Sequence, residues 1–161
     1  MKKKDTQSTL EGKKAPLFSL SNQDGKMISL KGYIGKGNVL LYFYPKDMTS
    51  GCTVEAIGFS ELKAKLQKAG VTVFGISKDS VDRHKKFCEK ENLKIDLLSD
   101  EVGNVLQKYG VWKEKTLYGR KYMGISRESF FIGKNGKVLK HWMKAQPKDH
   151  PDEVLAFAKG L

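Results

Sequence analysis

The chain has 161 residues, a formal net charge of +12 and a hydrophobic share of 39%. This length and composition suit a globular domain with a real core, and they exclude collagen-like and low-complexity chains. No apolar run approaches the roughly 20 residues of a membrane span, and the basic start lacks the apolar stretch of a secretory signal. We therefore expect a cytoplasmic protein without membrane contact, one domain over 1–161, in which residues 1–11 form a flexible arm.

The hydrophobic pattern alternates strands and helices along the chain. Short strands are expected over 15–20 and 27–30, separated by a turn at 22–25. The strongest strand signal is the apolar run within 37–45, which suits a central strand buried on both faces and ends at Pro45. The remaining expected elements are a helix over 52–69, a strand over 71–77, a helix over 80–92, a strand over 95–100, a helix over 101–109, strands over 129–133 and 137–143, and a helix over 151–160. This order predicts an α/β domain with a mixed central sheet flanked by helices.

The positive charge is spread along the chain, and its densest stretch, 112–144, also contains several aromatic residues. Basic side chains between aromatic ones can bind nucleic acid, which makes a nucleic-acid-binding or chaperone-like protein one possible class. No nucleic-acid-binding motif accompanies the charge, however. A solvated basic surface over buried aromatics is the preferred interpretation, and no nucleic-acid partner is expected.

The chain has two cysteines, Cys52 and Cys88, and three histidines, His84, His141 and His150. The cysteines form neither a CxxC pair nor a zinc quartet, and the histidines at 141 and 150 lack ligand spacing, so neither a metal site nor a cofactor is expected. His84 is interpreted as a residue that fills one face of its helix rather than as a catalytic base. Because structural disulfides are unusual in cytosolic proteins, the cysteines are inert thiols, reactive thiols or a redox pair.

Cys52 follows the predicted central strand and a polar loop over 46–51, and it opens the next predicted helix. Ligands of α/β sheets bind at the carboxyl ends of strands, beside helix N-termini. Free N–H groups and the helix dipole there favour an anion, so a thiolate would be stabilised. Since Cys52 follows a Thr-Ser-Gly turn rather than lying in the apolar stripe, a reactive thiol is favoured over an inert buried one.

Residues 42–59 read YFYPKDMTSGCTVEAIGF, in which Pro45, Thr49 and Cys52 form a P-x-x-x-T-x-x-C pattern. This pattern resembles the active-site loop of the peroxiredoxins, and the longer string is similar to their bacterioferritin comigratory protein, or peroxiredoxin Q, branch. Further matches follow in order: APLFSLSNQDGKMISL, GISKDSVDRHKKF, LLSD and YGRKYMGISRESFFIGKNGKV. The resemblance covers residues 12–160.

The resemblance implies a thioredoxin-like fold with an N-terminal β-hairpin and the activity of a thiol-dependent peroxidase. The Cys52 thiolate would attack hydrogen peroxide or an organic hydroperoxide and become a sulfenic acid. A thioredoxin or a similar dithiol would be the reductant. The branch is often monomeric, so a monomer is expected. A thiol-disulfide oxidoreductase on the same fold is disfavoured because a CxxC pair is absent.

The resemblance also assigns roles around Cys52. Thr49 and the backbone near Gly51 would donate hydrogen bonds to the peroxide, and Arg127 would stabilise both the thiolate and the charge of the transition state. Pro45 would shape the pocket and shield the thiolate from water. Glu55 would orient Arg127 or another basic group.

Two positions depart from the pattern of this branch. Ser50 stands where the loop usually has proline. Its side chain can cap the helix, and the loop is expected to be less rigid without the proline ring. Ile57 stands where many members have the resolving cysteine, whereas Cys88 resembles in placement the resolving cysteine that other members carry on the following helix. The resemblance thus implies a disulfide between Cys52 and Cys88. An inert Cys88 and a one-cysteine mechanism with an external thiol remain the alternative.

Overall fold

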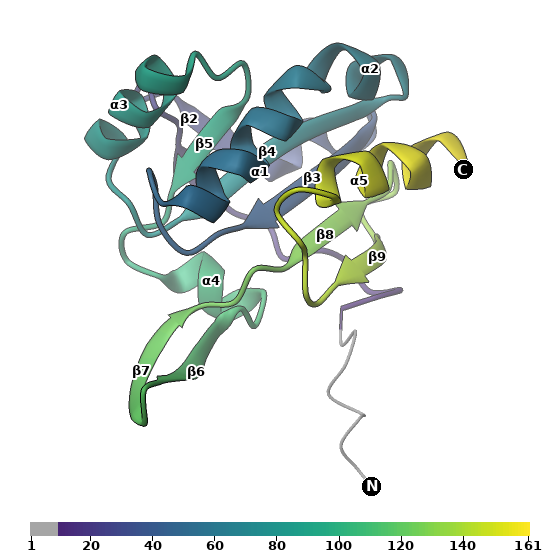
Figure 1. Ribbon diagram of the computed structural model, residues 1–161. Coiled ribbons are helices and arrows are strands. Elements are labelled where there is room, and N and C mark those ends of the chain that lie inside the picture. Colours follow the sequence, from purple (N-terminus) through teal and green to yellow (C-terminus); the bar gives the residue numbers. More distant parts are fainter. Residues whose placement is uncertain (1–9) are drawn as a thin grey trace, which may run out of the picture.

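The computed structural model describes residues 10–161 and confirms the predicted α/β fold with a mixed central sheet (Figure 1). The seven-stranded sheet has the order β2-β1-β5-β4-β3-β8-β9. Its strands are β1 (Ser19–Ser21), β2 (Met27–Ser29), β3 (Asn38–Phe43), β4 (Val71–Ser77), β5 (Asp96–Ser99), β8 (Ser129–Ile132) and β9 (Val138–Trp142). The helices are α1 (Ser50–Glu61), α2 (Lys63–Lys68), α3 (Val81–Glu91), α4 (Asn104–Lys108) and α5 (His150–Lys159), with a 3-10 turn η2 (Leu30–Tyr33).

The N-terminal segment forms the β-hairpin that the resemblance implied. β1 and β2 pair antiparallel, with Leu20 opposite Ile28. Residues 1–9 of the expected flexible arm lie outside the described residues, and Glu11 at its end forms a β-bridge with Val138.

β3 lies at the centre of the sheet, as its continuous apolar run predicts. It pairs parallel with β4 and antiparallel with β8, so that Leu41 stands opposite both Phe74 and Phe130. Every residue from Val39 to Phe43 is buried. Because β3 has a neighbour on each side, the loop that leaves its carboxyl end emerges at the middle of the sheet edge.

Alternate side chains of β3 enter two separate cores. Val39, Leu41 and Phe43 pack with α4 and the N-terminal segment on one face. Leu40 and Tyr42 pack on the other face with residues of α1, α2, α3 and α5. The helices that carry the two cysteines, α1 and α3, therefore cover the same face of the sheet (Figure 1).

Two predicted elements need correction, and one hairpin was missed. The expected strand over 15–20 is reduced to β1, and the expected helix over 52–69 starts earlier, at Ser50, and is divided at Leu62 into α1 and α2. A further hairpin, β6 (Trp112–Leu117) and β7 (Arg120–Ile125), was not predicted. Most of its residues are exposed or only partly buried, so no alternation of apolar and polar residues marks it. Figure 1 shows it extending from the main body.

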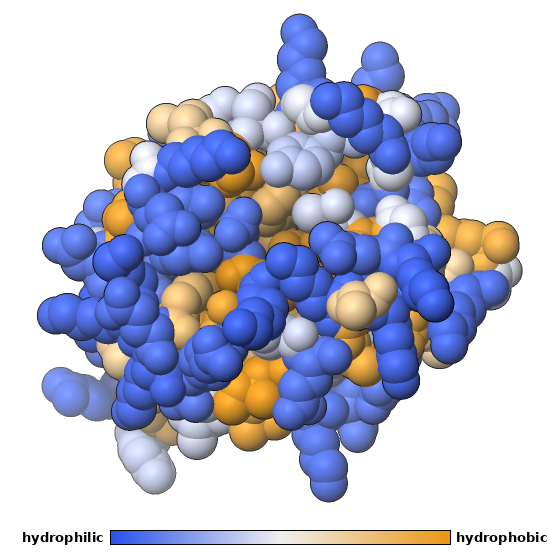
Figure 2. Space-filling view, turned by 90° about the horizontal axis from the view of Figure 1, so that it is seen from above, coloured by the Kyte–Doolittle hydropathy of each residue, from blue (hydrophilic) through white to orange (hydrophobic). Residues whose placement is uncertain are grey.

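The surface is largely polar. Figure 2 shows hydrophilic side chains, in blue, over most of the face seen from above, with smaller apolar patches between them. Among the described residues, no helix combines the length and the hydropathy that a membrane crossing requires.

Candidate active site

Cys52 lies in the first turn of α1 and is almost completely buried. The helix begins after Thr49, whose extended backbone (φ −86°, ψ 158°) makes it the N-cap residue. Ser50 is the first helical residue, so the expectation that its side chain caps the helix is wrong. The Thr49 hydroxyl does not cap either: it accepts no hydrogen bond from the N–H groups of α1, and it donates to the carbonyl oxygen of Lys46 at 2.8 Å. The first N–H groups of α1 thus lack a side-chain cap beside the thiol.

Arg127, in the segment between β7 and β8, reaches the thiol from another part of the chain. Its Nη2 donates to Cys52 Sγ at 3.3 Å, and its Nη1 donates to Glu55 Oε1 at 2.6 Å. Cys52 and Glu55 are three residues apart on α1 and share a face of the helix, so one guanidinium bridges both. A Cβ at Gly51 would stand 3.2 Å from Arg127 Nη2, so glycine leaves room for this approach.

Burial acts on both charged partners of Cys52, but it prevails only at Glu55. It raises the pKa of Glu55 to about 7, although the Arg127 guanidinium acts in the opposite direction. Burial would lower the pKa of Arg127, but the Glu55 carboxyl and the Cys52 sulfur raise it above its usual value. Arg127 therefore stays cationic beside the sulfur. Glu55 Oε2 is buried and has no hydrogen-bond partner among the described residues.

Pro45 and Thr49, the other residues of the sequence pattern, are exposed in the loop before α1. The Thr49 hydroxyl must release its bond to Lys46 before it can donate to a peroxide. Beside the start of α1, an open hollow is lined by residues of the helix and of the 146–149 segment, namely Ser50, Gly51, Val54, Gln146, Pro147, Lys148 and Asp149. The hollow adjoins the first turn of α1, but Cys52 itself does not line it.

Cys88 lies in α3 and is partly buried, and both cysteines are free thiols. Burial, together with the carboxylates of Asp47 and Asp96, raises the pKa of Cys88 to about 12. The described structure is thus a dithiol state in which Cys88 is held protonated.

Sequence reasoning missed two features around the site. Lys115 on β6 has its pKa lowered by burial and by Arg127, while Cys52 raises it. It belongs to the unpredicted hairpin, so no sequence signal placed it near Cys52. His84, interpreted as filling one helix face, is completely buried, and both of its ring nitrogens have hydrogen-bond partners.

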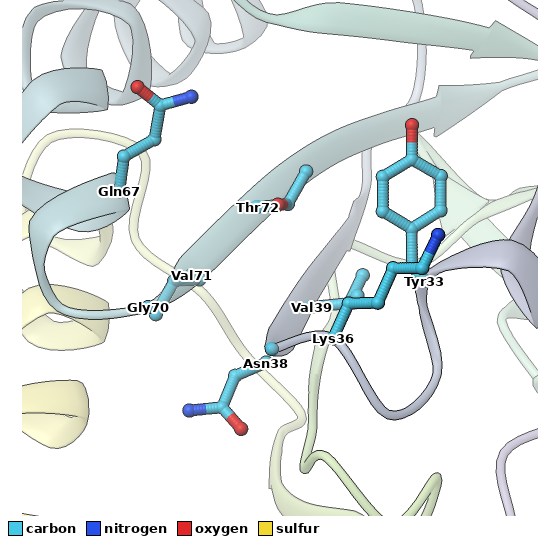
Figure 3. Close-up of a pocket in the computed structure, with 9 residues that line it drawn as sticks. Tyr33, Lys36, Asn38, Val39, Gln67, Gly70, Val71 and Thr72 are labelled. Carbon is cyan, nitrogen blue, oxygen red and sulfur yellow. The ribbon is translucent and has the colours of Figure 1, made fainter.

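The other histidines also have protein partners. His141 Nε2 lies 2.7 Å from Glu128 Oε1, and His150 Nε2 lies 2.8 Å from Ser129 Oγ. A separate cavity is lined by Tyr33, Lys36, Gly37, Asn38, Val39, Gln67, Gly70, Val71 and Thr72 (Figure 3). It lies at the starts of β3 and β4, at the opposite end of these strands from Cys52, and it contains none of the residues that the sequence assigned to the site.

Comparisons with known proteins identify the family of the chain. Residues 11–141 match the model of the AhpC/TSA family. Peroxiredoxin Bcp of Escherichia coli K12 is 46% identical over 145 residues, which cover 90% of this chain and 92% of that protein. A solved structure of Xanthomonas campestris peroxiredoxin Q has a TM-score of 0.84 and 37% identity, covering 89% of this chain and 90% of that one.

A second X. campestris structure is of its bacterioferritin comigratory protein and concerns the alkyl peroxide reduction activity of that protein. It has a TM-score of 0.84 and 36% identity, with the same coverage of 89% and 90%.

Proposed function

The chain belongs to the AhpC/TSA family, and we propose that Cys52 is the thiol with which it attacks peroxides. It is a thiol-dependent peroxidase, as its peroxiredoxin Bcp and peroxiredoxin Q relatives imply. Its substrates are peroxides and its reductant is a thiol. One observation carries the proposal for Cys52: the Arg127 guanidinium donates to Sγ at 3.3 Å, in the first turn of a helix that has no side-chain cap. Free N–H groups at such a helix start favour an anion.

The proposed reaction begins with the Cys52 thiolate. Its sulfur attacks one peroxide oxygen, the O–O bond breaks, and the other oxygen leaves as an alkoxide or hydroxide that takes up a proton. The sulfur becomes a sulfenic acid. Negative charge moves from sulfur to the leaving oxygen, so a fixed cation and N–H donors along this line lower the barrier. Arg127 and the backbone near Gly51 would supply them.

Further roles follow from the surroundings of Cys52. Glu55 holds Arg127 Nη1 at 2.6 Å and would fix the orientation of the guanidinium. Thr49 would donate to the bound peroxide after its bond to Lys46 opens, and Pro45 would bound the pocket on the side of the loop. The alkyl peroxides on which the X. campestris relative acts are proposed as substrates here, together with hydrogen peroxide.

The second half of the cycle is proposed to use Cys88. The thiol of Cys88 would attack the Cys52 sulfenic acid, form a disulfide and release water, after which a thioredoxin-like dithiol would reduce the disulfide by exchange. Because both cysteines belong to one chain, this cycle needs no second subunit, which supports a monomer. A cytoplasmic location supplies the reducing partner that the cycle requires.

The test compares Cys52→Ser with Cys88→Ser. Cys52→Ser should abolish turnover of hydrogen peroxide and of an alkyl hydroperoxide, whereas Cys88→Ser should still consume one equivalent. If Cys52→Ser keeps most of the wild-type rate, the assignment of Cys52 is wrong. In the wild type, a free-thiol count and peptide mass map after one equivalent of peroxide should show a 52–88 link and no free thiol. A free Cys88 with oxidised Cys52 would instead demonstrate the one-cysteine mechanism.

A further inference from the structure

A buried hydrogen-bond network joins the active-site loop to α3. Asp47, in the loop five residues before Cys52, is 1% exposed, and its Oδ2 lies 2.6 Å from Nδ1 of the completely buried His84 on α3. His84 Nε2 lies 3.0 Å from the carbonyl oxygen of Leu98. Tyr44 directly follows β3, and its hydroxyl donates to Asp47 Oδ1 at 2.6 Å.

These contacts require a shared proton. A carbonyl oxygen only accepts, so His84 Nε2 carries the hydrogen that points to Leu98. Burial, followed by Asp47, raises the pKa of Tyr44 well above its usual value, so its hydroxyl remains a donor to Oδ1. A second proton therefore lies between Asp47 Oδ2 and His84 Nδ1, whichever atom holds it. Because both side chains are buried, removing only one partner of such a contact leaves the other partner unsatisfied at a high cost in free energy.

The backbone of Asp47 is held by Asp79, just before α3, and by Arg83 in the first turn of α3. Its N–H donates to Asp79 Oδ2 at 2.8 Å, and its carbonyl oxygen accepts from Arg83 Nη2 at 3.2 Å. Arg83 Nε also donates to Asp79 Oδ1 at 3.0 Å. Asp47, Asp79 and His84 come close enough together to suggest a metal site, but the atoms concerned already take part in these bonds. The cluster is therefore a tether between two segments.

We propose that Asp47 and His84 are positioning residues of the peroxidase cycle. This pair, here called the Asp47–His84 latch, joins the loop before Cys52 to the helix turn before Cys88. It therefore controls how often both cysteines leave their folded positions and come close enough to react with each other. The inference rests on the proposed function of Cys52 and Cys88. Both thiols are free in this structure, whereas a disulfide needs Cα atoms within roughly 4.4–6.8 Å and sulfurs at bonding distance, so the chain must rearrange.

The latch would decide between two fates of the sulfenic acid. In one, the Cys88 thiol attacks Cys52–SOH, the S–O bond breaks, and a disulfide and water form. In the other, a second peroxide transfers an oxygen to Cys52–SOH, which becomes a sulfinic acid while the peroxide is reduced to an alcohol or water. A closed latch keeps Cys52 in the pocket and favours the second fate. An open latch favours the first.

The experiment weakens the latch and measures both fates. Asp47→Ala and His84→Ala remove one partner each. His141→Ala is the matched control, because the His141 side chain is 6% exposed and lies 2.7 Å from the Glu128 carboxylate, while its hydrogen-bond partners, Glu11 and Glu128, lie outside the loop and α3. Disulfide formation after one equivalent of peroxide is followed by rapid quenching and mass spectrometry. Sulfinic acid is counted after repeated turnover, and the rate of sulfenic acid formation is measured in a Cys88→Ser background.

We expect both latch variants to form the disulfide about tenfold faster or more, since loss of a buried partner strongly favours local opening. They should accumulate less sulfinic acid per turnover, while sulfenic acid formation keeps its wild-type order of magnitude and His141→Ala forms the disulfide at the wild-type rate. Unchanged disulfide formation, or acceleration equal to that of His141→Ala, would overturn the proposal.

A measurement on the wild type covers the case in which the variants do not fold. Amide hydrogen exchange should show residues 46–51 and the first turn of α3 opening together, with one common protection factor. Independent opening of the two segments would overturn the latch. Failure of the proposed function looks different: the wild type would then show no 52–88 link, or Cys52→Ser would keep its activity, whatever the latch variants do.

Discussion

The two cysteines lie on the same face of one sheet but in opposite electrostatic surroundings. Cys52 opens α1, where N–H groups are free, and a guanidinium donates to its sulfur. Cys88 lies near the end of α3, where free carbonyls gather, and burial together with Asp47 and Asp96 raises its pKa to about 12. In the proposed cycle, position along a helix and the sign of the neighbouring charge thus distinguish the thiol that attacks peroxide from the thiol that stays protonated. We expect that Cys88 does not compete for peroxide while α3 is folded.

The largest expected effect concerns the reactivity of Cys88. A shift in its pKa from 9.0 to about 12 lowers the thiolate fraction at neutral pH about a thousandfold. In a Cys52→Ser background, alkylation of Cys88 by iodoacetamide should be slower by about this factor than in the same chain unfolded in urea. The measurement is the pH profile of alkylation. If the pH profile of alkylation in the folded chain has its midpoint at the ordinary pKa of a thiol, Cys88 is not held protonated and the contrast with Cys52 is absent.

The next effect concerns the cation beside Cys52. Arg127→Ala removes a fixed donor from the developing charge, and the rate of sulfenic acid formation should fall ~10²–10³-fold. Arg127→Lys should recover only part of this rate, because one ammonium lacks the planar fork that reaches both Cys52 and Glu55. Stopped-flow oxidation by hydrogen peroxide measures both. The control, Arg120→Ala, changes an exposed arginine on β7 and should leave the rate as it is.

The third effect is a pH dependence that belongs to Glu55. Burial raises its folded-state pKa from 4.5 to about 7, so the folded chain binds a proton in this range that the unfolded chain releases. The stability that Glu55 contributes is therefore complete below about pH 4.5 and is lost as the pH rises to about 7, by up to about 3 kcal/mol. Denaturant unfolding at several pH values should show this loss in the wild type relative to Glu55→Gln.

Glu128 provides a control of the opposite sign. Burial would raise its pKa, but hydrogen bonds from His141 and Lys113 lower it. The stability that Glu128 contributes is therefore complete above its ordinary pKa and is lost as the pH falls below that pKa. If wild type and Glu55→Gln show the same pH dependence between 4.5 and 7, the neutral carboxyl beside Arg127 is refuted.

The surroundings of Cys52 could be anticipated from sequence because they are mostly local. The apolar run of β3, the polar loop and the helix follow one another in the chain, so their order alone places Cys52 at a strand–helix junction. The approach of Arg127 is not local and was anticipated only by resemblance. The structure places its guanidinium against Cys52 Sγ and Glu55, while the catalytic roles of these residues stay predictions.

The surroundings of Cys88 and the outer hairpin could not be anticipated. The partners of His84 come from the loop at Asp47 and from Leu98 in β5, and no spacing within α3 reveals them. β6 and β7 contribute little to the core, so the alternation that marks a buried strand is missing. Their turn uses Tyr118 and Gly119, both at positive φ, instead of an Asn-Gly pair.

The smallest expected effect tests the rigidity of the Cys52 side alone. Ser50 is the first helical residue and Thr49 before it is extended, so proline at 50 fits the backbone on both counts. Ser50→Pro should raise the free energy of unfolding by about 0.4–1 kcal/mol through the unfolded state, and thermal unfolding measures this. If the first turn of α1 must unwind before Cys52 meets Cys88, the same substitution should slow disulfide formation about twofold to fivefold. Ser50→Ala, which restricts no dihedral, is the control. A stabilised Ser50→Pro variant that forms the disulfide at the wild-type rate would show that the opening takes place on the Cys88 side, in α3.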